Sequence, residues 1–174
     1  MKELKDYVRN VPDFPKKGIL FRDITTILQD KDAFKLSIDM MQKELEDLDF
    51  DIIVGPESRG FIFGTPISYN LNKSFVPIRK EGKLPAETIS ETYDLEYGTA
   101  TIEIHKDAIK DGQKVVIIDD LMATGGTLEA MIKLVERLGG KVVRVVCLIE
   151  LPDLNGREKF KDYDIRTIIK FSGT

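Results

Sequence analysis

The chain has 174 residues, of which 42% are hydrophobic and 32% charged, and its formal net charge is −4 at pH 7. This size and composition predict one globular domain over residues 1–174, and the acidic charge argues against a dedicated nucleic-acid-binding protein. No apolar run approaches the roughly 18 residues of a membrane span, and the charged start MKELKDYVRN is not that of a signal peptide, so we expect a cytoplasmic protein without nucleic-acid or membrane partners.

The first third of the chain combines helical patterns with a proline-containing segment. Leu4, Val8 and Val11 would lie near one face of a short helix. The next segment, PDFPKKGILFRDIT, contains two prolines and a glycine and predicts an ordered loop. Residues 32–48 repeat apolar side chains close to every 3.6 positions, which predicts an amphipathic helix.

Strand-type and helix-type segments alternate in the middle of the chain. FDIIVG (residues 50–55) predicts a buried strand, FIFGTPISYNL (61–71) a helix and SFVPIR (74–79) a second strand. Residues 80–98 are polar and punctuated by glycine and proline, which predicts a long loop. TATIEI (99–104) alternates apolar and polar residues as a strand does.

The clearest pattern lies in the last third of the chain. Residues 114–119 and 141–150 are apolar on both faces of two predicted strands, and residues 127–138 between them carry the apolar stripe of a helix that ends at two glycines. A strand, a helix and a strand of this kind form a unit of a parallel sheet. DYDIRTIIKF (162–171) predicts a further strand. The predicted fold class is therefore α/β, with a parallel sheet flanked by helices.

One cysteine and one histidine limit the possible chemistry. A single cysteine excludes an intrachain disulfide, and Cys147 lies in an apolar strand, so we predict a buried small hydrophobic residue. His105 has no second histidine or cysteine at ligand spacing, which predicts a surface or strand-end position and excludes an all-protein zinc site.

The string VVIIDDLMATGGT (115–127) joins a strand to a helix through a glycine-bearing turn. It lacks the lysine of a P-loop and the G-x-G-x-x-G of a dinucleotide-binding fold. A turn with two hydroxyls and successive N–H groups at a helix start still fits one phosphate monoester. The residues of this turn are Ala123, Thr124, Gly125, Gly126 and Thr127.

Two aspartates, Asp119 and Asp120, precede this turn and would repel a phosphate placed beside them. Carboxylates at a strand end can instead accept hydrogen bonds from paired sugar hydroxyls. An acid pair next to a phosphate turn therefore indicates a 5-phosphoribosyl group. The alternative is that the acids cap a turn and the glycines only serve backbone geometry.

The same string resembles the phosphoribosyl-pyrophosphate signature of the type I phosphoribosyltransferases. FPKKGILFRDIT, GPESRGFIFG, IRKEGKLP, YDLEYGTATIEIHKDAI and GREKF resemble, in the same order along nearly the whole chain, the adenine-specific branch of that family. The resemblance implies a small hood over the parallel sheet, to which residues 1–30 contribute, and a homodimer. It also implies formation of AMP and pyrophosphate from adenine and 5-phosphoribosyl-1-pyrophosphate with Mg²⁺.

The resemblance assigns two groups of residues to the pyrophosphate. The loop GPESRG supplies Glu57, Ser58, Arg59 and Gly60, whose alternative is an ordinary glycine turn with a surface arginine. The segment RKEGK supplies the cations Arg79, Lys80 and Lys83. Such runs are mostly solvated faces, but a pyrophosphate leaving group needs cations to stabilise its developing charge, and in the family some of these reach the ligand across the dimer interface.

Residues 81–98 resemble the family's flexible catalytic loop, which would shield an oxocarbenium-like centre from water. Catalytic roles then belong to Glu96, which aligns with the glutamate that handles the proton on adenine N7, to the neighbouring Tyr97, and to Arg59. By residue type alone, Glu96 would be a surface loop acid.

The adenine site implied by the resemblance lies at Phe21 and Arg22. Phe21 could stack on a purine or pack in the core, while backbone groups around both residues would read the exocyclic amine and a ring nitrogen. Mg²⁺ would be held mainly by the ligand's oxygens and water, with Asp119 or Asp120 touching it through water.

Two other functions compete with adenine transfer. A 6-oxopurine transferase would use hypoxanthine, guanine or xanthine with the same phosphoribosyl site. A non-catalytic regulator would keep the fold as a sensor of phosphoribosyl ligands, but the acidic charge and the presence of Glu96 argue against it.

Overall fold

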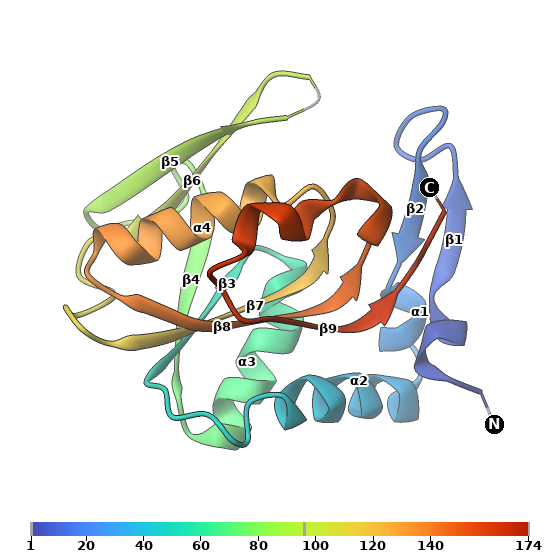
Figure 1. Ribbon diagram of the computed structural model, residues 1–174, viewed down its shortest axis with the longest axis horizontal. Coiled ribbons are helices and arrows are strands. Elements are labelled where there is room, and N and C mark those ends of the chain that lie inside the picture. The colour runs from blue at the N-terminus through green and yellow to red at the C-terminus, as the bar shows by residue number, and fades with distance from the viewer. Residues whose placement is uncertain (1, 96, 174) are drawn as a thin grey trace.

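The computed structural model describes residues 2–95 and 97–173. Within them, a seven-stranded sheet has the order β5-β6-β4-β3-β7-β8-β9, and β1 and β2 form a separate small sheet (Figure 1). The strands are β1 Arg9–Pro12, β2 Leu20–Asp23, β3 Ile52–Pro56, β4 Ser74–Lys80, β5 Thr88–Asp94, β6 Thr99–His105, β7 Lys114–Met122, β8 Lys141–Glu150 and β9 Ile165–Lys170. The α-helices are α1 Thr25–Leu28, α2 Lys31–Lys43, α3 Arg59–Leu71 and α4 Gly126–Arg137, and the 3-10 helices are η1 Leu4–Tyr7, η2 Pro152–Leu154 and η3 Gly156–Phe160.

The strands β4, β3, β7, β8 and β9 form the parallel part of the large sheet. The β5–β6 hairpin extends it beyond β4 in antiparallel pairing. The expected α/β class, with a mainly parallel sheet flanked by helices, is confirmed. The antiparallel hairpin is the part that the strand patterns did not reveal.

Strand β7 is buried on both faces because helices cover both sides of the sheet. Val116 and Ile118 pack into the core that includes α2 and α3, whereas Val115 and Ile117 pack into the core beneath α4. Figure 1 shows α4 on one side of the sheet and α2 and α3 on the other. This two-sided burial explains why the β7 sequence is a continuous apolar run rather than an alternating one.

The amphipathic helix expected over residues 32–48 is confirmed as α2, although it ends at Lys43. Its start is capped by Asp30, whose side chain accepts hydrogen bonds from the N–H groups of Asp32 and Ala33 at 3.0 and 2.9 Å. Beyond Lys43 the chain continues in tight turns, which still bury Leu45 in the same core.

Two segments differ from the sequence-based expectation near the N-terminus. The predicted helix at residues 4–11 is only the 3-10 turn η1, followed by β1, and the predicted loop contains β2. The reason is non-local, because Val11 pairs with Phe21 in an antiparallel hairpin whose backbone hydrogen bonds replace helical ones.

The segment predicted as a long loop, residues 80–98, also contains a strand, β5. Its backbone pairs with β6 along seven residues, from Thr88 with His105 to Asp94 with Thr99, and Ile89 and Tyr93 pack against the core beneath α4. These partners stabilise a polar segment as a strand. Its composition carries no sign of them and therefore predicted a loop.

Cys147 is buried in β8, as predicted, and His105 is the last residue of β6, where its Nε2 accepts a hydrogen bond from the Ala86 N–H at 3.3 Å. None of the helices in residues 2–95 and 97–173 is long and apolar enough to cross a membrane.

Adjacent methionines in α2 provide a matched test of this packing. Met41 is 0% exposed and Met40 is 37% exposed. We expect Met41→Ala to lower the free energy of unfolding by about 2–5 kcal/mol, because it leaves a cavity in the core. Met40→Ala should change it by no more than about 0.5 kcal/mol. Urea unfolding of both variants measures the difference, and equal losses would contradict the assignment of the buried face.

Candidate active site

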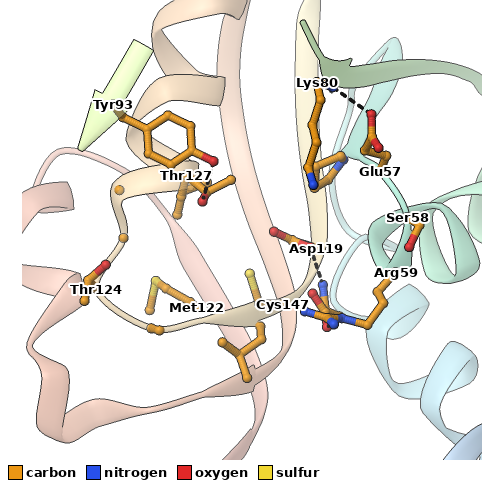
Figure 2. Close-up of a pocket in the computed structure, with 17 residues that line it drawn as sticks. Glu57, Ser58, Arg59, Lys80, Tyr93, Asp119, Met122, Thr124, Thr127 and Cys147 are labelled. Carbon is orange, nitrogen blue, oxygen red and sulfur yellow. Dashed lines mark hydrogen bonds and ion pairs between the residues drawn. The ribbon is translucent and has the colours of Figure 1, made fainter. Parts of the chain in front are cut away.

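A cavity of about 450 Å³ lies at the carboxyl ends of β3 and β7 (Figure 2). From β3 the sheet continues to β4 on one side and to β7 on the other, so the two neighbouring strands lead away in opposite directions. Such a switch point is where open α/β sheets bind ligands. The cavity is lined by Pro56, Glu57, Ser58, Arg59, Lys80, Tyr93, Asp119, Asp120, Leu121, Met122, Ala123, Thr124, Gly125, Gly126, Thr127, Leu128 and Cys147.

The turn expected to bind phosphate forms one wall of this cavity. Gly125 precedes α4 with φ of 89°, a left-handed conformation that favours glycine. The first N–H groups of α4, from Gly126 onward, have no partner within the helix, and the hydroxyls of Thr124 and Thr127 lie beside them (Figure 2). The turn from Ala123 to Thr127 therefore presents N–H groups and hydroxyls in an arrangement that can bind an anion.

The two aspartates lie on the floor of the cavity and differ in their partners. Asp120 is buried and its Oδ2 is 2.6 Å from Nε of Arg59, which reaches across from the start of α3. The Asp119 Oδ1 accepts the Asp120 N–H at 2.7 Å. Burial, followed by the neighbouring Asp120 carboxylate, raises the pKa of Asp119 well above its usual range. Asp120 is thus paired with an arginine, and the Asp119 side chain is partly buried at the cavity.

Glu57 follows β3 and organises the cations on the opposite wall. Its Oε1 accepts the Lys80 backbone N–H at 2.7 Å and lies 3.4 Å from Arg79 Nε, and its Oε2 is 2.8 Å from Lys83 Nζ. Burial by itself raises the pKa of Glu57, but the bonds from Lys83 and from the Lys80 N–H hold that pKa below its ordinary value. Glu57 is therefore an anchor for cations rather than an anion-binding group.

Among the predicted pyrophosphate residues that the structure describes, Ser58, Arg59 and Lys80 line the cavity with Glu57. Figure 2 shows the Lys80 side chain extending from β4 into the cavity. Gly60 instead permits close packing, because a Cβ there would lie 2.6 Å from Pro56 Cδ and 3.3 Å from Asp119 Oδ1. Gly60, Arg79 and Lys83 do not line the cavity, but they contact residues that do.

The predicted base-binding residues lie on β2, next to Arg59. The Arg59 guanidinium carbon is 5.6 Å from the centre of the Phe21 ring, and the Phe14 ring packs edge-on against Phe21 at 5.2 Å. The Arg22 side chain turns away, donating hydrogen bonds to Asn10 Oδ1 at 2.6 Å and to the Gly173 carbonyl at 2.9 Å. The Arg22 side chain is thus engaged in internal contacts, whereas the Phe21 ring lies beside Arg59.

The predicted catalytic residue Glu96 lies outside the described residues. Tyr97 is 71% exposed at the tip of the β5–β6 hairpin, and Lys16 Nζ lies 4.1 Å from the centre of its ring. This contact joins the tip of the β5–β6 hairpin to the loop between β1 and β2, although Tyr97 itself does not reach the cavity.

Six cavity residues were not among the predicted site residues: Pro56, Tyr93, Leu121, Met122, Leu128 and Cys147. Tyr93 lies on β5, and its hydroxyl accepts a hydrogen bond from Thr127 Oγ1 at 3.2 Å. No local signal marked it, because it belongs to the segment that was predicted to be a loop. Cys147 was identified as buried, and burial raises the pKa of its thiol well above the ordinary value, but its position beside Asp119 depends on strand pairing.

No group of three or more His, Cys, Asp or Glu side chains in residues 2–95 and 97–173 is arranged to hold a metal. The pair Asp119 and Asp120 remains beside the anion site. Mg²⁺ typically keeps several waters and takes one or two carboxylates together with substrate phosphates. The residues present therefore fit a Mg²⁺ ion that arrives with a phosphorylated ligand, and they do not form a protein-only site.

Comparison with known proteins adds a separate line of information. The model of the phosphoribosyl transferase domain family matches residues 23–173. An adenine phosphoribosyltransferase of Lachnoclostridium phytofermentans is 68% identical over 173 residues, which cover 99% of this chain and 99% of that protein.

Two solved structures are similar along nearly the whole chain. The adenine phosphoribosyltransferase of Thermoanaerobacter pseudethanolicus has a TM-score of 0.94 and 58% identity, covering 97% of this chain and 98% of its own. The Saccharomyces cerevisiae enzyme, complexed with adenine and an imino-altritol bisphosphate, has a TM-score of 0.90 and 41% identity, covering 95% and 96%.

The electrostatic coupling of the aspartates can be tested by removing one charge. In Asp120→Asn, we expect the pKa of Asp119 to fall, because deprotonation no longer places two like charges side by side. Carboxyl ¹³C chemical shifts followed by NMR across a pH titration measure this pKa. Asp164→Asn, a charge change at an ion pair with Arg144, is the control and should leave it unchanged. An unchanged Asp119 pKa in Asp120→Asn would contradict the coupling.

Proposed function

The chain belongs to the adenine phosphoribosyltransferase family of the type I phosphoribosyltransferases, and we propose that it performs the family's reaction in the cavity at the ends of β3 and β7. In this reaction adenine and 5-phosphoribosyl-1-pyrophosphate form AMP and pyrophosphate. Relatives named for adenine, at up to 68% identity over the full length, favour adenine over the 6-oxopurines and favour an enzyme over a ligand-sensing regulator.

One observation carries the location of the site: a single cavity contains an anion-binding turn, an acid pair and a cationic wall. The turn from Ala123 to Thr127 receives the 5-phosphate, because its helix N-terminus attracts anions. Asp119 and Asp120 accept hydrogen bonds from the ribose hydroxyls. The sugar then lies between the turn and the loop at residues 57–59, with its C1 toward that loop.

The pyrophosphate group lies against Ser58, Arg59 and Lys80, where positive charge stabilises the negative charge that develops as the C1–O bond breaks. Glu57 contributes indirectly, since its carboxylate holds Lys83 and the Lys80 backbone in place. Lys83 and Arg79 complete this cationic wall from behind, and some of these cations act across a homodimer interface.

Adenine stacks beside Phe21, which lies next to Arg59 and so near the C1 end of the ribose. Backbone groups of Phe21 and Arg22 read the exocyclic amine and a ring nitrogen. This assignment is supported by the Arg22 side chain, which is engaged with Asn10 and Gly173 and leaves only backbone groups for the base. Residues 1–30 thereby form the hood over the base.

The segment of residues 81–98 excludes water from the reacting centre, and Glu96, with its neighbour Tyr97, handles the proton on adenine N7. Mg²⁺ would be held mainly by oxygens of the ligand and by water, with Asp119 or Asp120 touching it through water, and it would neutralise charge on the leaving group. The single domain over residues 1–174, the homodimer and the cytoplasmic location stay predictions.

Base specificity is the direct test of the function. With phosphoribosyl pyrophosphate and Mg²⁺ present, we expect turnover with adenine and none above background with hypoxanthine, guanine or xanthine. Chromatographic detection of the nucleoside monophosphates measures all four reactions side by side. Turnover of a 6-oxopurine in preference to adenine would assign the chain to the other branch, and a lack of turnover with every base would reject the enzymatic proposal.

The role of Glu96 can be separated from ligand binding. In Glu96→Gln we expect kcat for AMP formation to fall about 10²–10⁴-fold, the range typical of general acid–base groups. The Kd for phosphoribosyl pyrophosphate should stay within about twofold, since no contact to that ligand is assigned to Glu96. Stopped-assay kinetics and calorimetric titration measure the two quantities. Unchanged kcat would refute the role, and Glu87→Gln, in the same segment, is the control.

A further inference from the structure

The segment GREKF has no part in the proposed chemistry, yet it lies directly behind the phosphate-binding turn. It forms η3, in which Gly156 and Phe160 are buried. A Cβ on Gly156 would lie 2.5 Å from the Ala123 carbonyl oxygen, and a Cβ on Gly125 would lie 2.8 Å from the Phe160 ring. The two segments are therefore in contact without space for a methyl group between them.

Arg157, the neighbour of Gly156, fastens η3 to the end of β8 and to the first half of β9. Its Nε donates to Glu150 Oε1 at 2.6 Å, its Nη1 to the Ile165 carbonyl at 2.9 Å and its Nη2 to Thr167 Oγ1 at 3.3 Å. Thr167 in turn donates to Glu150 Oε2 at 2.7 Å. One planar guanidinium thus connects three elements, which a lysine ammonium could not do with the same geometry.

Glu150 is 3% exposed, although it carries a carboxylate. Burial alone would raise the pKa of Glu150, but the hydrogen bonds from Arg157 and Thr167 hold that pKa below its ordinary value, so the side chain is ionised at neutral pH. A buried charge of this kind is stable only with its partners in place. Arg157 and Thr167 are therefore held in a defined geometry around Glu150.

The same residue is tied to the strand that enters the turn. Glu150 is the register partner of Met122, the last residue of β7, and the Leu151 N–H donates to the Met122 carbonyl at 3.0 Å. Met122 is thus paired with Glu150, and Glu150 is hydrogen-bonded to Arg157. Gly156, the neighbour of Arg157, packs back against Ala123. The phosphate-binding turn is held at its entry by β8 and at its back by η3.

We propose that Glu150 and Arg157 are positioning residues for the 5-phosphate of the ligand. They hold Gly156 against Ala123, so that the N–H groups of the turn converge before the phosphate arrives. Preorganised donors gain affinity because no ordering cost remains at binding. This inference rests on the proposed function, because it assumes that the turn binds a 5-phosphate. Neither residue touches the ligand, since the cavity is lined by the turn in front of them.

The test is Arg157→Lys, which keeps the charge and loses the three-way hydrogen bonding. We expect the Kd for AMP and for ribose 5-phosphate to rise about tenfold, the order expected for lost hydrogen bonds to charged groups. The Kd for pyrophosphate alone, which binds at the opposite wall, should stay within about twofold. In steady-state assays, KM for phosphoribosyl pyrophosphate should rise while KM for adenine does not. Isothermal titration of the full chain measures the three affinities.

Two further variants separate positioning from general stability. Gly156→Ala leaves Arg157 in place but pushes on Ala123, and should produce the same phosphate-selective loss. Arg144→Lys is the matched control, because Arg144 lies near the other end of β8 and pairs with Asp164 at 2.8 Å and Asp47 at 3.0 Å. It should lower the melting temperature without a change in ribose 5-phosphate affinity.

Each outcome of these binding measurements either supports or overturns the positioning role. Selective loss of 5-phosphate ligands in Arg157→Lys, and not in Arg144→Lys, supports the proposal. Equal loss of all ligands in both variants, or unchanged ribose 5-phosphate affinity in Arg157→Lys, overturns it while the proposed function stands. If the unmodified protein binds neither AMP nor ribose 5-phosphate, the proposed function fails, and the positioning role fails with it.

Discussion

The parallel pairing of β3 with β7, over Ile52–Val54 and Val115–Ile117, holds the carboxyl ends of the two strands at one edge of the sheet. The Arg59–Asp120 pair of the cavity follows from this register. The segment after β3 carries Arg59, the end of β7 carries Asp120, and only adjacent parallel strands bring these two side chains to 2.6 Å. The helices that begin after each strand then direct their N-termini into the same space, which makes this edge suitable for anions.

Charges of opposite sign alternate around the cavity, and this explains how two aspartates can lie beside an anion-binding turn. Asp120 is paired with Arg59, and Glu57 is paired with Lys83. Negative ligand groups are thus favoured at the two ends of the cavity, where N–H groups and cations lie, and hydroxyl groups are favoured in the middle. This charge pattern complements a sugar that carries a phosphate at one end and a pyrophosphate at the other.

The buried parts of the fold were predictable from sequence. Burial of one face gives apolar residues at regular intervals, and burial of both faces gives a continuous apolar run. The strands β3, β7 and β8 and the helices α2 and α4 appear at the expected positions. The strand β6 was predicted, but β1, β2 and β5 were not, since these strands are short or polar and depend on backbone pairing with another segment of the chain. Composition carries no signal for such pairing.

For the site, the sequence by itself determined the chemical parts: the turn at residues 123–127, the acid pair before it, and the cations of two other segments. These are local strings whose residue types and order are sufficient to indicate a phosphoribosyl ligand. Only the tertiary structure decided which parts line the cavity, because that depends on strand order and side-chain direction. In the folded chain, Glu57 and Arg22 make internal contacts and Tyr93 lines the cavity. Gly156 and Arg157 lie behind the turn. Contacts between residues far apart in the chain leave no local pattern, and they exist only once the sheet has formed.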